Sequence, residues 1–134
     1  MKTILLLSVL LLAGQNALTA APDARDTFWQ QFKTAVTNKN VDAIATLSRF
    51  PIGMSYGIPT VKSKSDLRKR YRKLFNEQTD AAACFRRAKL ETDHDNTKHF
   101  TVACPDAAGN EVVIYHFNET RTGWKFTGMD NLNE

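Results

Sequence analysis

Residues 84–104 read CFRRAKLETDHDNTKHFTVAC, with one of the chain's two cysteines at each end. From residue 82 onward apolar and polar side chains alternate, with the period of two that is typical of strands. If the stretch forms a hairpin that turns around His94, Cys84 lies opposite Cys104 on the neighbouring strand. Residues 1–20 have the layout of a secretory signal peptide, and two cysteines in a small exported domain usually pair. The sequence therefore predicts a Cys84–Cys104 disulfide that closes this hairpin.

The alternation continues through two further turns, PDAAGN at 105–110 and NETRTG at 118–123, and predicts four antiparallel strands. A turn centred on residues 107 and 108 would place Phe100 opposite Tyr115. One face of this sheet collects apolar side chains and must therefore meet the helices. Its members are Cys84, Ala88, Leu90, Phe100, Val102, Cys104, Val113, Tyr115, Phe117, Trp124 and Phe126. The opposite face is mostly polar, and we expect it to be solvated.

The first half of the chain predicts three helices and a short strand pair. Apolar residues recur at helical spacing within 22–40 and again within 41–48. The stretch IGMSYGIPTV then reads as two short strands around a Gly57–Pro59 turn. The third helix is expected to start at Ser63, because Asp66 three places later gives the spacing of a capping box.

The N-terminal residues 1–20 have the layout of a secretory signal peptide. One basic residue precedes an apolar run from Ile4 to Ala13, and small and polar residues follow. This run is too short to span a membrane as a helix, and no comparable run follows, so we expect no transmembrane segment. We expect cleavage after Ala20 and a single domain over 21–134 that is secreted or periplasmic.

Three stretches resemble small bacterial secreted members of the nuclear transport factor two-like (NTF2-like) superfamily: RFPIGMSYG at 49–57, KSKSDLRKRYRKLF at 62–75 and GWKFTGMDN at 123–131. The resemblance implies an α+β fold in which N-terminal helices pack on a curved antiparallel sheet shaped as a cone. The cystatin fold is similar in outline. However, residues 106–113 read DAAGNEVV and lack the Gln-x-Val-x-Gly loop by which cystatins block cysteine proteases.

The same resemblance suggests where a cavity site would lie. Enzymes that resemble ketosteroid isomerases keep an Asp or Glu inside such a cone as the base, beside a Tyr or a second acid. By strand parity the inward candidates here are Tyr115, Arg86 and, at the end of the last strand, Asp130, while Tyr56 and Tyr71 come from other elements. The strands offer no clear counterpart of the base, and each tyrosine also reads as a core aromatic.

Arg86 is the most informative of these candidates, because strict alternation from Cys84 points it into the cone. A buried guanidinium keeps its charge and needs a carboxylate or a bound anion. The sequence therefore predicts that Arg86 pairs with Asp130 or anchors an anionic group of a ligand at the cavity mouth. The alternative is a bulge at Arg86–Arg87 that turns both side chains to water.

The third predicted helix is the most basic part of the chain. Seven Lys and Arg residues lie within 62–73 against Asp66 alone, whereas residues 90–134 have eight acidic residues against three basic ones. The cations that lie away from the apolar stripe of this helix are Arg68, Lys69, Arg72 and Lys73. Such asymmetry favours an acidic protein or an anionic envelope surface as partner. Nucleic acid is not expected, since no aromatic residues are interleaved there, and a merely solvated charged face is the competing interpretation.

Two histidines stand out on the polar face of the predicted sheet. The predicted second hairpin sets His99 opposite His116, and two imidazoles on adjacent strands can hold a metal ion. Such sites generally need a third or fourth ligand, which the predicted neighbours Thr101, Lys89 and Lys125 do not supply. The sequence therefore predicts neither a metal nor a cofactor.

These observations favour an exported, non-catalytic binding domain over an enzyme. Such a domain would bind a small ligand in the cone cavity, or a protein or envelope partner through the basic helix. The alternatives are a small cavity enzyme of the ketosteroid-isomerase type, or an inhibitor or immunity protein. The sequence does not set an oligomeric state, and a dimer is compatible with it.

Overall fold

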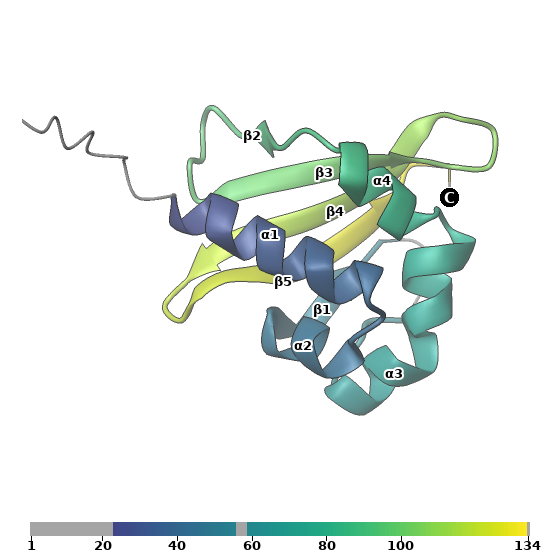
Figure 1. Cartoon of the computed structure of the whole chain (residues 1–134), viewed down its shortest axis with the longest axis horizontal. Helices are drawn as coiled ribbons and strands as arrows, with labels where there is room; N and C mark the ends of the chain where they lie inside the picture. Colours follow the sequence, from purple (N-terminus) through teal and green to yellow (C-terminus); the bar gives the residue numbers. More distant parts are fainter. Residues whose placement is uncertain (1–22, 56–58, 134) are drawn as a thin grey trace, which may run out of the picture.

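The computed structural model of the chain describes residues 23–55 and 59–133. Its elements in chain order are α1 (Ala24–Thr37), α2 (Val41–Thr46), β1 (Ser48–Met54), α3 (Lys64–Arg72), the π-helix η1 (Lys73–Glu77), α4 (Ala81–Arg87), β2 (Glu91–Thr92), β3 (His99–Pro105), β4 (Glu111–Thr120) and β5 (Gly123–Asn131). The strands form one sheet in the order β1-β5-β4-β3-β2. The predicted α+β class, with N-terminal helices packed on a sheet, is confirmed (Figure 1).

Several predictions from the sequence concern residues outside these ranges. The signal peptide at 1–20 and its cleavage site lie there, as do Tyr56 and Gly57. Among the described residues, no helix is both long and apolar enough to cross a membrane. The signal peptide and the export of the domain therefore remain predictions.

The helix starts follow the local sequence. Asp23, Asn40 and Asp80 each accept a hydrogen bond from a main-chain N–H in the first turn of the helix that follows. At the start of α3, Ser63 Oγ accepts from Asp66 N at 3.2 Å, and Asp66 Oδ2 accepts from Lys62 N at 3.1 Å. The predicted start of this helix at Ser63 is confirmed.

The sheet is mixed rather than purely antiparallel, which corrects the prediction. Strand β1 runs parallel to β5 and places Gly53 beside Gly128 and Met54 beside Met129. The predicted strand pair on either side of the Gly57–Pro59 turn is reduced to a single bridge between Ile52 and Val61. Pairing between segments so distant in sequence leaves no local signal in the side-chain alternation, so the alternation did not indicate it.

The hairpins have the predicted faces but a shifted register. Phe100 lies opposite Phe117 rather than Tyr115, and Tyr115 lies opposite Val102. The pairing is irregular between Cys104 and Pro105, next to the β3–β4 turn in which Asp106 Oδ1 accepts from the main-chain N–H groups of residues 108 and 110. A shift of two residues preserves strand parity. The apolar residues predicted to face inward in β3, β4 and β5 are therefore buried, from Phe100 to Phe126.

The disulfide prediction is confirmed, but the predicted hairpin around it is wrong. Cys84 and Cys104 are bonded, with their Cα atoms 5.7 Å apart. Cys84 lies in α4, so the bond fastens a helix to β3 rather than one strand to its neighbour. The segment AAACFRR is rich in helix-forming Ala and Arg and follows the cap Asp80, and these signals prevail over the apparent alternation. Only Glu91–Thr92 pairs with β3 on that side.

Candidate functional site

Two tyrosines named from the sequence, Tyr115 of β4 and Tyr71 of α3, hydrogen-bond to main-chain oxygens. Tyr115 is fully buried and donates to the main-chain oxygen of Leu74 at 2.6 Å, and burial raises the pKa of its phenol above the ordinary value. Tyr71 is half-buried and donates to the main-chain oxygen of Val36 at 3.1 Å. Burial raises the pKa of the Tyr71 phenol as well. Both phenols are therefore neutral structural donors at physiological pH.

Aromatic rings occupy the space between the helices and the sheet. The ring centroid of Phe32 in α1 lies 5.0 Å from that of Phe117 and 5.3 Å from that of Phe126. The ring of Phe75 stacks on that of Tyr115 with the centroids 5.8 Å apart. All five of these side chains are 0% exposed. The volume in which a cavity was predicted is thus filled by packed side chains.

Arg86 and Asp130 do not meet, and the predicted inward placement of both is wrong. Arg86 lies in α4 with an exposed side chain, and its Nε donates to the oxygen of Ala82 at 3.1 Å, one helical turn earlier. Asp130 points to the outer face because a bulge opposite His116–Phe117 reverses the alternation within β5. Neither the Arg86–Asp130 pair nor an anion site on Arg86 in the cone is therefore part of the structure.

The four basic side chains named from the sequence in α3 and at the start of η1 are all exposed, as predicted: Arg68, Lys69, Arg72 and Lys73. Arg68 and Lys64 contact Asp42 of α2 at 3.1 and 2.8 Å, and these cations, Lys64 foremost, hold the pKa of the Asp42 carboxyl below its usual value. Arg72 contacts Glu77 at 3.3 Å. Within the described part of the chain, Lys69 and Lys73 have no ion pair. Leu67, Leu74 and Phe75 of the same segment are buried.

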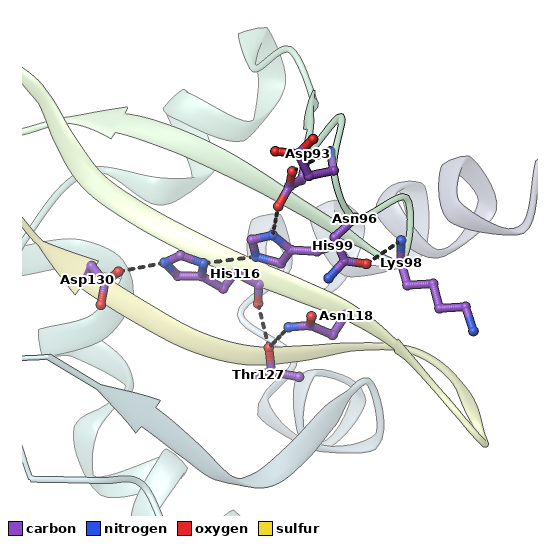
Figure 2. Close-up of polar contacts among 9 residues, drawn as sticks. Asp93, Asn96, Lys98, His99, His116, Asn118, Thr127 and Asp130 are labelled. Atoms are coloured by element: carbon purple, nitrogen blue, oxygen red, sulfur yellow. Dashed lines mark hydrogen bonds and ion pairs between the residues drawn. The ribbon is translucent and has the colours of Figure 1, made fainter.

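The outer face of the sheet holds a chain of four polar side chains (Figure 2). His99 Nε2 in β3 lies 3.1 Å from His116 Nδ1 in β4, and the two rings are nearly parallel, with an interplanar angle of 11°. His116 Nε2 lies 2.7 Å from Asp130 Oδ2 in β5. At the other end, His99 Nδ1 lies 3.7 Å from Asp93 Oδ2. The four side chains are between 21% and 42% exposed, so they are partly accessible to solvent.

Sequence reasoning anticipated the two histidines but neither carboxylate. In the observed register His116 lies opposite Thr101, yet the rings of His99 and His116 still meet diagonally across the strands. Strand parity alone places Asp130 on the inner face, because it takes no account of the bulge. A glycine inside a strand is a signal for a bulge, and Gly128 in β5 could have indicated this one.

A shallow hollow of about 380 Å³ adjoins His116 and Asp130 on this face. Gly128 lies opposite His116 and beside Gly53 of β1, and these two positions have no side chain to fill the hollow. Ser55 also lines the hollow, and its buried hydroxyl has no hydrogen-bond partner among the described residues. The outer face thus combines a hydrogen-bonded histidine pair with an accessible depression.

Comparison of the sequence with models of protein families and with curated proteins finds no match. Among solved structures, a protein of the NTF2-like family from Streptomyces avermitilis is similar at 14% identity over 80% of this chain and 91% of that chain, with a TM-score of 0.45. A domain with a cystatin-like fold from Nostoc punctiforme is similar at 12% identity over 83% and 75%, with a TM-score of 0.45.

A Mycobacterium tuberculosis protein in complex with estradiol-17beta-hemisuccinate is similar at 10% identity over 83% of this chain and 94% of that chain, with a TM-score of 0.48. Similarity at this level concerns the arrangement of elements, and function has to be argued from the side chains of this chain.

Proposed function

We propose that this protein is an exported, non-catalytic binding domain that recognises an acidic protein or an anionic envelope surface through the basic face of α3. We define the basic face as the exposed side chains Arg68, Lys69, Arg72 and Lys73. The observation that carries the proposal is the contrast between this exposed cationic face and the aromatic packing beneath the sheet. Packed aromatic rings between the helices and the sheet favour binding at the surface over binding inside.

The ion pairs of the basic face are of a kind that a partner can replace. The contacts of Arg68 with Asp42 and of Arg72 with Glu77 lie in solvent, where such pairs contribute little to stability. Carboxylates or phosphates of a partner can therefore take over these guanidinium groups at small cost. Lys69 and Lys73 add two cations that serve chiefly to steer an anionic partner toward the helix.

The test compares two variants of equal charge. One replaces the four residues of the basic face by Gln, and the other replaces four exposed cations elsewhere by Gln: Arg86, Arg87, Lys89 and Lys98. We expect the wild type to bind phosphatidylglycerol vesicles or an immobilised acidic polypeptide in a salt-dependent manner. The first variant should lose at least tenfold in affinity and the control less than threefold.

Each outcome of this test has a defined meaning. Binding to vesicles alone identifies an envelope surface, and binding to the polypeptide alone identifies an acidic protein, which includes the target of an inhibitor or immunity protein. Equal losses of affinity in the two variants would show that net charge alone determines binding. That result would contradict recognition by a specific face. Binding of neither probe, or a basic-face variant that loses several kcal/mol of stability with binding intact, would overturn the proposal.

The packed cone does not favour the two alternatives that use a cavity. A small ligand in the cone would have to displace rings such as those of Phe32 and Phe75, which are 0% exposed. A proton-transfer enzyme would need an ionisable group in open space, whereas the inward phenol of Tyr115 is fully buried and hydrogen-bonded.

A further inference from the structure

The protons of the two outer-face histidines are placed by their neighbours. Asp130 accepts a hydrogen bond from His116 Nε2, so that nitrogen carries a proton and Nδ1 of the neutral ring presents a lone pair. His99 Nε2, 3.1 Å away, then donates its proton to this lone pair. Protons on both facing nitrogens would bring two N–H groups together, so the gap between the rings holds one proton.

The two outward nitrogens of the pair both face carboxylates. His116 Nε2 is bonded to Asp130 at 2.7 Å, and His99 Nδ1 lies 3.7 Å from Asp93. Histidines that bind metal ions almost always donate their remaining ring N–H to a carboxylate, a carbonyl or water, which orients the ring and raises its basicity. The chain Asp93–His99–His116–Asp130 has this arrangement at the His116–Asp130 end, with a proton in the central gap. At the other end Asp93 places a negative charge 3.7 Å from His99 Nδ1, beyond hydrogen-bond distance.

We propose that His99 Nε2 and His116 Nδ1 together bind a divalent transition-metal ion that prefers imidazole, such as Zn²⁺ or Cu²⁺, in place of the shared proton. Two nitrogens bound to one tetrahedral zinc ion at about 2.0–2.1 Å lie about 3.3 Å apart. The observed separation of 3.1 Å is close to this value. The ion lies off the line between the two nitrogens, so both rings turn until their lone pairs point at it.

Proton positions in the metal-bound form follow from the same contacts. His116 keeps its proton on Nε2, toward Asp130, and the remaining proton of His99 lies on Nδ1, toward Asp93. A neutral His99 reaches this form by exchanging its Nε2 proton for one on Nδ1, and an imidazolium His99 releases one proton to solvent. Each carboxylate then faces an N–H group and supports the ligand that carries it.

The remaining coordination positions are left to water. Within residues 23–55 and 59–133, no group of three or more His, Cys, Asp or Glu side chains is placed to hold a metal ion. The sequence predicts no metal because it offers no third ligand. It does not indicate that each imidazole has a carboxylate beside its outward nitrogen. The side chains of His99 and His116 are 21% and 27% exposed, so water from solvent can complete the coordination of the ion.

The experiment titrates the mature protein with Zn²⁺ by calorimetry and records the electron paramagnetic resonance spectrum of the Cu²⁺ form. We expect one site per chain and nitrogen hyperfine structure from two imidazoles. His99→Ala and His116→Ala should each lower Zn²⁺ affinity at least tenfold. Asp130→Asn should lower it about tenfold while keeping the stoichiometry, because it weakens the acceptor behind His116 and leaves both ligands in place.

His94 supplies the matched control, since it is the third histidine of the chain and is exposed between β2 and β3. His94→Ala should bind both ions as the wild type does. The proposal is overturned if the wild type binds Zn²⁺ no better than the His99→Ala/His116→Ala double variant, or if His94→Ala abolishes binding. A Cu²⁺ spectrum with fewer than two coordinated imidazoles also overturns it, and that result needs no variant to fold.

Discussion

The two faces of β4 have different surroundings, although their residues alternate along the same strand. Val113, Tyr115 and Phe117 point inward and are 0% exposed, packed among the rings of α1, η1 and α4. His116 and Asn118 point outward and are half-buried, and their side chains hydrogen-bond to residues of the neighbouring strands. The difference indicates that the inner face supplies stability, whereas the outer face and the helix surfaces are free to carry binding chemistry.

The largest effect on the free energy of unfolding is expected where the inner face is most tightly packed. Phe117→Ala should lower the free energy of unfolding by about 3–5 kcal/mol, because a ring within 5.0 Å of the rings of Phe32 and Phe100 leaves a cavity that these neighbours cannot fill. Asn118→Ala, one residue along on the outer face, should cost less than about 1.5 kcal/mol. Urea unfolding of both variants measures the contrast, and equal losses would show that the two faces do not divide these tasks.

The disulfide should have the next largest effect, since it ties α4 to the inner side of β3. Replacing Cys84 and Cys104 together by Ala opens a loop with a sequence separation of 20 and should destabilise the domain by about 3 kcal/mol. The domain should still unfold cooperatively, because the aromatic core remains. Denaturant midpoints of the oxidised protein and the variant test this. Two thiols that react with alkylating reagent in the untreated protein would show that the bond is absent in solution.

The phenol of Tyr115 adds a pH dependence to the inner face. Tyr115→Phe should cost about 1 kcal/mol at neutral pH, because the main-chain oxygen of Leu74 loses its donor. Burial raises the pKa of this phenol in the folded state. The folded protein therefore holds the proton more tightly than the unfolded chain, whose tyrosine titrates near pH 10. The contribution of this phenol to stability is thus fully present below about pH 10 and is lost as the pH rises further.

Unfolding measured between pH 8 and 11.5 should show a smaller alkaline loss for Tyr115→Phe than for the wild type. Tyr71→Phe is the matched control, because its phenol is only half-buried. The same alkaline slope in the wild type and in Tyr115→Phe would contradict the assigned role of the buried hydroxyl.

The smallest effect on stability is expected at the basic face. Replacing its four cations by Gln should change the free energy of unfolding by less than about 1 kcal/mol, because their ion pairs are exposed and screened by solvent. Thermal unfolding at low and at physiological salt measures this change. A drop comparable to that of Phe117→Ala would place the basic face among the stabilising regions and remove the contrast with the inner face.

Local sequence determined the features that depend on near neighbours. Ser63 with Asp66 marks the start of α3, and the alternation from Phe100 to Phe126 selects the buried side chains of three strands correctly. Parity survives a register shift of two residues, so the inward set did not require the correct turn. The disulfide pair followed from there being only two cysteines in a chain expected to be exported.

Only the tertiary structure decided where distant segments meet. Cys84 is different, because local signals place it in a helix: the cap Asp80 and the alanines that follow prevail over the apparent alternation, and the tertiary structure decides only that this helix packs against β3. Asp130 faces outward because one bulge in β5 reverses parity, and a single bulge leaves the hydropathy pattern almost unchanged. The contact between His99, His116 and Asp130 depends on that bulge and on two strand registers together. Pairing between strands is set by the packing of the whole sheet, which no single stretch of sequence encodes.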